Sequence, residues 1–267
     1  MVARIRRLAS QKRVGHAGTL DPLAEGVLPV LVGRATRLAD FIHLGRKTYV
    51  TTIALGIATE TDDVEGAVTS VAPIPDLDVS SLEDTLERFR GEIQQVPPKY
   101  SALKVSGQRA YALARAGSAV DLAPRPVTIS ELKLVRFSGS ELTLEVTCTK
   151  GTYIRALARD IALALGTLGH MQSLVRTRVG PYSLTDALTL DEIAARGVAD
   201  ALLPASTAIP DAPTFVADAS EAARFANGQA LPATGLHDTS VWVYDPVGRL
   251  IGLGSAQGDL LRPRLAL

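Results

Sequence analysis

The feature that most constrains the fold is a segment in which a strand pattern gives way to a helix pattern. From Leu142 to Cys148 apolar and polar side chains alternate, which is the period of a half-buried strand. Beyond Gly151 the apolar residues recur every three or four positions, at Ile154, Leu157, Ile161 and Leu165. Gly166 ends the helix that this spacing predicts. A strand leading straight into an amphipathic helix predicts a sheet covered by helices, with Arg155 at the junction. A lone Arg at such a junction is more often a surface residue than a catalytic one.

Other segments add elements of the same kinds. Residues Lys47–Ala58 alternate as a strand whose buried row contains Tyr49, Thr51, Ile53, Leu55 and Ile57. The ring of Tyr49 is therefore expected to point inward. We also expect helices over Val2–Ser10 and from a cap at Ser81, paired with Asp84, as far as Gly91.

A Pro- and Ala-rich segment, Leu203–Pro213, predicts a linker. After it come short strand patterns punctuated by glycine, at Ser240–Tyr244 and Leu250–Leu253. We therefore expect one large domain over residues 1–211 and a small β domain over residues 212–267.

Composition excludes several classes of protein. At 267 residues and 46% hydrophobic, the chain can bury a sizeable core, and it has no apolar run near the roughly 18 residues of a membrane helix. Cys148 is the only cysteine and the four histidines are widely spaced, so we expect neither a disulfide nor a metal site. The basic N-terminal segment lacks the apolar stretch of a secretory signal, which leads us to expect a cytoplasmic protein.

Charge is balanced overall but unevenly distributed. The chain has 28 basic and 28 acidic residues, yet positions 1–50 contain nine basic residues against three acidic ones. Positions 97–120 contain no acid and interleave lysines and arginines with Tyr100 and Tyr111. Basic side chains near aromatic rings suit phosphates and unstacked bases. Charge alone leaves RNA binding and ordinary solvated surfaces equally open.

The most unusual stretch is Gly15–Leu28, with the sequence GHAGTLDPLAEGVL. Its glycines allow close backbone approach, and Pro22 pushes Asp21 towards extended geometry. Asp followed by Pro is also a common start of a helix, with the Asp as the cap. Spacing alone favours that structural interpretation of Asp21. Phosphate-loop and nucleophile-elbow patterns are missing from the sequence.

Taken together, these residues resemble the TruB family of tRNA pseudouridine synthases. The family motif reads Gly-His-x-Gly-x-Leu-Asp-Pro and continues into Gly-Val-Leu, as residues 15–28 do. Lys47-Thr48-Tyr49 resembles the family's Lys-x-Tyr motif, and Gly151–Arg155 resembles its Gly-Thr-Tyr-Ile-Arg motif. Residues 97–127 look like its RNA-gripping, thumb-like insertion, and His170–Tyr182 looks like its Leu-Arg-Arg region. Five motifs in the expected order favour a catalytic Asp21 over a helix cap.

The resemblance implies an α+β fold, the pseudouridine synthase fold. Its central mixed, mainly antiparallel sheet is flanked by helices, and a small C-terminal PUA-like β domain follows. The implied reaction flips a uridine out of the T loop of transfer RNA and isomerises it to pseudouridine by carboxylate catalysis at C1′. Asp21 would be the catalytic carboxylate, with Arg155 paired to it, and Tyr49 would stack on the uracil. No cofactor is implied.

The resemblance also implies substrate-binding residues. His16 would fill the gap left by the flipped base, although a lone histidine is more often an ordinary loop residue. Leu174 would line the base pocket, and Lys104 and Arg176 would contact RNA. Tyr153 and Asp63 complete the implied binding set. The expected partner is the T stem-loop of transfer RNA, with no membrane, no obligate protein partner and a monomeric enzyme.

Two departures from the family pattern accompany the resemblance. Family members begin with a strand containing Lys-Pro-x-Gly-x-Thr-Ser, whereas this sequence starts in the helix that follows. We expect either a longer natural protein or an exposed sheet edge with impaired activity. Val175 replaces the first Arg of Leu-Arg-Arg, which removes one phosphate contact. The alternatives are a related synthase acting on another RNA and a non-catalytic RNA-binding protein.

Overall fold

The computed structural model describes residues 1–101, 104–105, 108–109, 122–236 and 238–267. The chain divides into two compact units. One unit, here called the central unit, comprises residues 19–28 and 44–187. The other, called the terminal unit, comprises residues 1–18, 29–43 and 188–267. The loop that carries Asp21 thus belongs to the central unit, although the segments on either side of it belong to the terminal unit.

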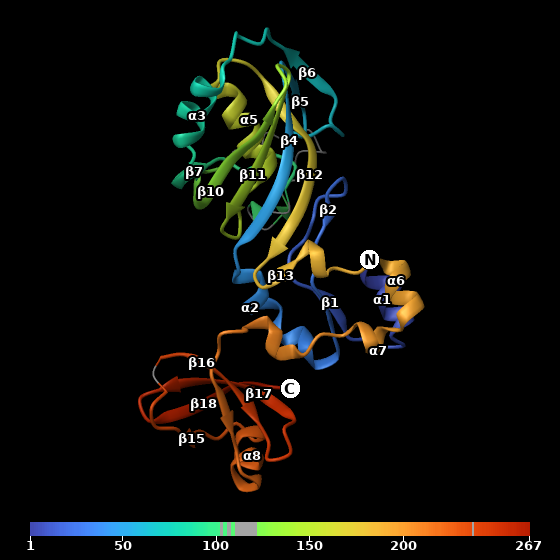
Figure 1. Cartoon of the computed structure of the whole chain (residues 1–267), viewed down its shortest axis with the longest axis vertical. Coiled ribbons are helices and arrows are strands. Elements are labelled where there is room, and N and C mark those ends of the chain that lie inside the picture. The colour runs from blue at the N-terminus through green and yellow to red at the C-terminus, as the bar shows by residue number, and fades with distance from the viewer. Residues whose placement is uncertain (102–103, 106–107, 110–121, 237) are drawn as a thin grey trace. The chain divides into compact units, whose positions relative to one another are not determined.

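A mixed, mainly antiparallel sheet forms the frame of the central unit (Figure 1). Its strand order is β13-β12-β4-β11-β10-β7, and β2 adds to β12 in parallel. The strands are β2 (Glu25–Gly26), β4 (Lys47–Leu55), β7 (Gly91–Gln95), β10 (Arg125–Phe137), β11 (Glu141–Cys148), β12 (Gly169–Val179) and β13 (Tyr182–Ser183). The α+β class and the mixed sheet expected from the sequence are confirmed.

Strand β4 follows the alternation in its sequence. Every second residue from Lys47 to Leu55 is buried, Tyr49 included, as expected. The strand ends three residues before the predicted Ala58, because Gly56 takes a φ of 87° that an extended strand does not accommodate. Past Gly56 the chain enters β5 (Ile57–Thr59), which pairs with β6 (Val68–Val71) instead of continuing the main sheet.

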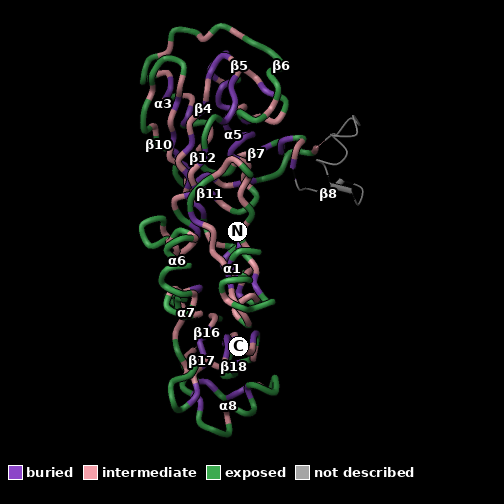
Figure 2. The backbone as a smooth tube through the Cα atoms, turned by 90° about the vertical axis from the view of Figure 1, so that its right-hand side faces the viewer, coloured by how far each residue is buried: buried purple, intermediate pink, exposed green. Residues whose placement is uncertain are grey.

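Helices α3 (Val79–Glu87) and α5 (Ile154–Ala164) pack against the central sheet (Figure 1). α5 contacts β12 and β4 through the apolar stripe predicted from its sequence, and Leu157 and Ile161 have almost no exposed surface. Buried stretches of backbone occur in both the strands and α5 (Figure 2). The stripe fixes the rotation of α5, and so it also fixes the direction in which Arg155 leaves its first turn.

The start of α3 differs from the prediction. Its cap is Asp78, whose Oδ1 accepts a hydrogen bond from Ser81 N at 2.8 Å, while Ser81 Oγ accepts one from Asp78 N at 3.2 Å. The predicted cap, Ser81 with Asp84, is therefore wrong by three residues. Ser81 closes the capping box instead of opening it, because Asp78 already satisfies the first free amides.

The central unit is completed by β8 (Lys104–Val105), β9 (Gln108–Arg109) and the 3₁₀ turn η2 (Leu184–Asp186). In the terminal unit, α1 (Val2–Leu8) confirms the first predicted helix to within two residues. β1 (Val14–His16) pairs with β3 (Val30–Val32), which leads into η1 (Gly33–Leu38) and α2 (Ala39–Leu44). Among the described residues, no helix has both the length and the apolar character required to cross a membrane.

The later part of the terminal unit contains a second sheet, in the order β14-β16-β17-β18-β15. Phe225 of α8 lies in its core together with Val241 and Leu261. The predicted strand Ser240–Tyr244 is confirmed as β16, and the pattern at Leu250 begins a strand longer than predicted. The elements are α6 (Leu190–Arg196), α7 (Val198–Ala201), η3 (Ala205–Ala208), β14 (Thr214–Val216), α8 (Ala219–Ala226), β15 (Leu231–Pro232), β17 (Leu250–Gln257) and β18 (Leu260–Ala266). η3 lies within the predicted linker.

Candidate active site

Asp21 does not cap a helix. The backbone after Pro22 makes a turn, in which Ala24 N donates to Asp21 O at 3.0 Å, and then enters the short strand β2. Glu25 and Gly26 pair with Val175 and Arg176 of β12. The helix start favoured by spacing alone is therefore wrong, because pairing with a distant strand extends the chain where a helix would begin.

The side chain of Asp21 forms a two-point ion pair with Arg155. Arg155 Nε donates to Asp21 Oδ2 at 2.9 Å and Arg155 Nη2 donates to Asp21 Oδ1 at 3.2 Å. The Arg155 side chain is 7% exposed and the Asp21 side chain is 34% exposed. A fork of this kind fixes the plane of the carboxylate as well as its position. Asp21 is thus held rigidly and still faces solvent.

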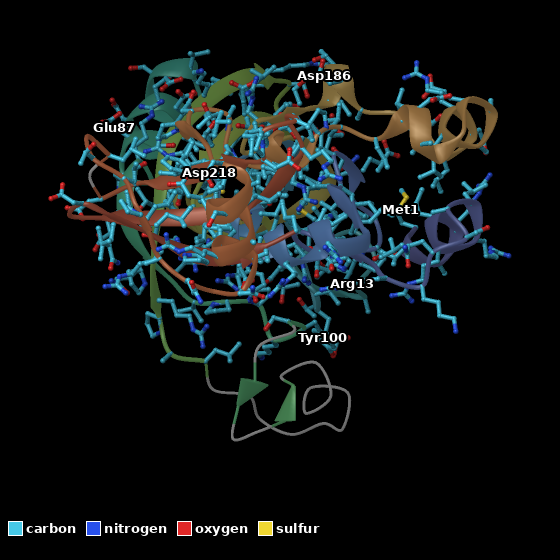
Figure 3. All side chains as sticks on the ribbon, turned by 90° about the horizontal axis from the view of Figure 1, so that it is seen from below. Met1, Arg13, Glu87, Tyr100, Asp186 and Asp218 are labelled. Carbon is cyan, nitrogen blue, oxygen red and sulfur yellow. The ribbon has the colours of Figure 1, made fainter. Side chains whose placement is uncertain are left out.

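Arg155 has further acceptors that fix it in turn. Its Nη1 donates to Thr61 O at 3.0 Å, and its Nη2 donates to Tyr100 O at 3.1 Å; Tyr100 is labelled in Figure 3. Its Nη1 also lies 3.4 Å from Asp63 Oδ2. A cation in the first turn of a helix is disfavoured by the helix dipole. The two carboxylates offset that cost at the start of α5.

Asp63 was expected to bind substrate. Its side chain is 6% exposed, and Oδ1 accepts from Thr61 Oγ1 at 2.5 Å and from Glu65 N at 3.1 Å. The remaining oxygen faces Arg155. The carboxylate is thus buried and occupied by groups of its own turn and by Arg155. A metal cation at this place would have to compete with Arg155 for Asp21 and Asp63.

One helical turn beyond Arg155, Arg159 holds the same region of the chain. Its Nη1 donates to Asp62 Oδ2 at 2.8 Å and its Nη2 donates to Val96 O at 2.9 Å. Asp62 takes a left-handed φ of 59°, which is uncommon for a residue with a side chain. Burial raises the pKa of the Asp62 carboxyl, and the Arg159 charge opposes that rise. The turn at residues 59–66 is thereby fastened to α5 at two successive arginines.

Tyr49 and Leu174 lie in the same apolar cluster, on neighbouring strands of the sheet. Tyr49 is 8% exposed, and burial raises the pKa of its phenol to about 12. The positive charge of Arg176, directly opposite Tyr49 on β12, opposes the rise. The phenol is therefore neutral at pH 7.

Arg176 was expected to contact RNA. The residue has 0% exposure. Its Nε donates to Val27 O at 2.8 Å and its Nη1 donates to Thr19 O at 3.3 Å. The guanidinium therefore faces the loop that carries Asp21.

The other expected binding residues are Tyr153, His16 and Lys104. Tyr153 precedes α5 and is half-buried, and its main chain is bound on both sides by the amide of Gln95, at 2.8 and 3.1 Å. His16 is exposed at the end of β1, in the terminal unit. The backbone of Lys104 belongs to β8, but its side chain lies outside the described residues, as does all of Tyr111.

Sequence reasoning missed three participants. Thr61 and Tyr100 bind Arg155 through backbone carbonyls, so their side chains gave no signal. Gly26 takes a φ of 98°, and a Cβ at this position would lie 2.2 Å from Arg176 O. In the sequence Gly26 is one of several glycines in the loop, and nothing there indicates its close approach to Arg176.

Comparison with family models gives consistent matches along the chain. The description "TruB family pseudouridylate synthase (N terminal domain)" matches residues 6–154. "tRNA pseudouridylate synthase B C-terminal domain" matches residues 155–207, and "Pseudouridine synthase II TruB, C-terminal" matches residues 213–266.

Curated relatives agree. The chain is 45% identical to "tRNA pseudouridine synthase B" of Bradyrhizobium diazoefficiens, over 99% of this chain and 80% of that protein. It is 43% identical to the protein of the same name in Thermobifida fusca, over 98% of this chain and 92% of that protein.

Solved structures give the same fold. A Cbf5-Nop10-Gar1 complex contains a chain that superposes with a TM-score of 0.69 at 25% identity, over 96% of this chain and 74% of that one. An H/ACA RNP bound to a substrate RNA containing 2′-deoxyuridine contains another, with a TM-score of 0.71 at 23% identity, over 99% of this chain and 79% of that one.

Proposed function

This chain belongs to the TruB family of pseudouridylate synthases, and on that premise we propose that it isomerises uridine to pseudouridine in the T loop of transfer RNA. The observation that carries the proposal is the Asp21–Arg155 pair, in which a partly exposed carboxylate is clamped in two directions by a buried arginine. Groups held in this way are suited to act on a substrate that enters from solvent.

The reaction is an isomerisation, so the nucleoside keeps its composition. The bond from N1 to C1′ breaks, the uracil turns within the site, and a bond from C5 to C1′ forms. The proton on C5 is lost and N1 gains one. Asp21 acts at C1′, either as the nucleophile or as the charge partner of the ribosyl transition state. Its fixed plane favours both roles, and no cofactor is required.

Arg155 keeps Asp21 oriented, because its two hydrogen bonds fix the plane of the carboxylate. Asp63 and the carbonyls of Thr61 and Tyr100 stop the guanidinium from following Asp21 into solvent. Asp63 is therefore a positioning residue for Arg155.

Tyr49 and Leu174 form the apolar floor on which the flipped uracil stacks. Flipping costs a few kcal/mol of lost base stacking, and an aromatic ring recovers part of it. At pH 7 Tyr49 is a neutral phenol. It can therefore accept a proton only after it has given up its own, and stacking on the uracil is its main contribution.

Recognition of the rest of the RNA falls to residues away from this pair. We assign His16 to the gap left by the flipped base, and Lys104 and Tyr153 to contacts with the T loop. The C-terminal sheet serves as a PUA-type RNA-binding domain, and the proline-rich segment before it supports a domain boundary between residues 211 and 212. Affinity for transfer RNA should fall steeply as salt rises. A flat salt response would count against RNA binding.

The deciding experiment uses unmodified transfer RNA tritiated at uridine C5, because isomerisation releases that tritium to water. The wild-type chain should release it from the T loop, and Asp21→Asn should slow the release by at least about 1000-fold. Glu25→Gln is the matched control: it removes an exposed carboxylate four positions later in the same loop and should change the rate by less than about 3-fold. Equal rates in Asp21→Asn and the wild type would overturn the assignment.

We further propose that the enzyme is a cytoplasmic monomer, since its substrate is cytoplasmic and Asp21, Tyr49 and Arg155 come from one chain. Light scattering during size exclusion, with and without transfer RNA, tests the oligomeric state.

A further inference from the structure

Arg176 fastens the loop that carries Asp21 at both of its ends. The guanidinium donates to Thr19 O, two residues before Asp21, and to Val27 O, six residues after it. These two carbonyls are eight positions apart in the sequence. Because the guanidinium is planar and rigid, binding both of them fixes their separation and so the shape of the loop between them.

The main chain of Arg176 adds to the same attachment. Val27 N donates to Arg176 O at 2.8 Å, and Gly26 pairs with Arg176 in the parallel ladder. The loop approaches so closely that a Cβ on Gly26 would lie within 3 Å of three backbone atoms of Arg176, its N, C and O. One residue of β12 therefore holds the loop through its backbone and its side chain together.

Arg176 also lies directly opposite Tyr49 in the antiparallel ladder of β12 and β4. Side chains of residues that face each other in such a ladder leave the same face of the sheet. The residue that holds the Asp21 loop is therefore the cross-strand neighbour of Tyr49, and its positive charge acts on the phenol.

We propose that Arg176 is a positioning residue that couples the Asp21 loop to Tyr49 and aligns the two for the reaction. This inference rests on the function proposed above. It replaces an RNA contact with an internal role, in which the residue acts through Asp21 and Tyr49 and does not touch substrate.

Arg90 offers a matched structural control. It also donates to a backbone carbonyl, that of Leu132, from Nε at 3.0 Å and from Nη2 at 2.8 Å, and it lies in the same unit. Its other partners are Glu83 and Glu87. Arg90→Lys should weaken packing between the end of α3 and β10 without changing the Asp21 loop.

The first test compares Arg176→Lys with Arg90→Lys in the tritium assay. Lysine keeps the positive charge but cannot bridge the two carbonyls with a rigid fork. Arg176→Lys should lower kcat by about 100-fold and leave the Kd for transfer RNA within about 3-fold, since the loop is displaced and no RNA contact is lost. Arg90→Lys should lower the Tm and leave kcat unchanged. If Arg176→Lys fails to fold, Arg176→Gln takes its place.

The second test does not depend on activity. Amide hydrogen exchange over residues 19–28, measured by mass spectrometry on the whole chain, should be at least about 10-fold faster in Arg176→Lys than in the wild type and unchanged in Arg90→Lys. If the wild type releases no tritium, the proposed function fails while the exchange experiment still tests the attachment of the loop.

Two results would overturn the inference. One is unchanged exchange over residues 19–28 in folded Arg176→Lys. The other is a loss of transfer RNA affinity in Arg176→Lys at unchanged kcat, which would show that Arg176 contacts RNA.

Discussion

Arg155 and Arg176 are both less than a tenth exposed, and both hold the loop of Asp21, yet the groups around them differ. Arg155 meets two carboxylates and two carbonyls, while Arg176 donates to two carbonyls of the loop and lies opposite Tyr49 in the sheet. At Arg155 one carboxylate reaches solvent, so charge is available for chemistry. At Arg176 the positive charge faces the dipoles of two backbone carbonyls, and the result is a loop of fixed shape. In the candidate site, Arg155 therefore holds the carboxylate that can react, and Arg176 holds the shape of the loop.

The largest expected effect lies on the Arg176 side. Gly26→Ala would combine a left-handed φ with a Cβ 2.2 Å from Arg176 O, and it should lower the free energy of unfolding by roughly 4 kcal/mol. Gly33→Ala is the control. Gly33 also has a positive φ, of 64°, but a Cβ there would meet none of the described residues within 4 Å, so this change should cost about 1 kcal/mol. Urea unfolding measures both. Equal losses would show that close packing on Arg176 contributes nothing.

The second prediction separates the two carboxylates of Arg155. Asp63→Asn should lower the free energy of unfolding by about 2 kcal/mol, because a buried carboxylate with charge-assisted hydrogen bonds is replaced by an amide. Asp21→Asn should lower it by less than about 1 kcal/mol, since Asp21 is partly exposed and Arg155 keeps its other acceptors. Urea unfolding of the two variants side by side checks this. A larger loss in Asp21→Asn would reverse the assigned roles.

The third prediction concerns pH. Burial raises the pKa of Tyr49 to about 12, above the ordinary value of 10.0, so the unfolded chain ionises first. The stability that Tyr49 contributes is complete below pH 10 and is lost as pH rises towards 12. Between pH 8 and pH 11 the wild type should lose about 1 kcal/mol more than Tyr49→Phe. Cys148, with a pKa raised by burial to about 11, is present in both proteins and cancels. Parallel pH curves would contradict a buried, neutral Tyr49.

The smallest effect is expected one turn along α5. Asp62→Asn removes one partner of Arg159, which keeps Asp160 and the carbonyl of Val96, and should cost about 0.5 kcal/mol in unfolding free energy. Its tritium release should match the wild type. A marked loss of activity would mean that the turn at residues 59–66 depends on Arg159 as much as on Arg155.

The sequence predicted the elements that carry the site better than the site itself. Alternation placed Tyr49 on a buried row, and the strand-to-helix run placed Arg155 at the start of α5, because both depend on local periodicity. Asp21 was misjudged by local spacing, since its partner is 134 positions away and β2 forms only through pairing with β12. Family resemblance supplied what spacing could not.

The burial of Arg176 and Asp63 was not foreseen, for a related reason. A charged residue in a motif is expected at the surface, and burial becomes reasonable only when its partners are known. Those partners are backbone carbonyls for Arg176 and a turn hydroxyl, a backbone amide and Arg155 for Asp63. None of these contacts has a signature in residue type.

Much of the attachment of the site is made to carbonyl oxygens, at Thr19, Val27, Thr61 and Tyr100. Every amino acid supplies the same carbonyl, so these four positions are free to change identity over evolution while the contacts persist. A scan of substitutions would score them as tolerant, and only changes that move the backbone, such as proline, would reveal them. Designers who graft this site onto another scaffold must therefore copy a path of main chain along with the side chains of Asp21, Tyr49 and Arg155.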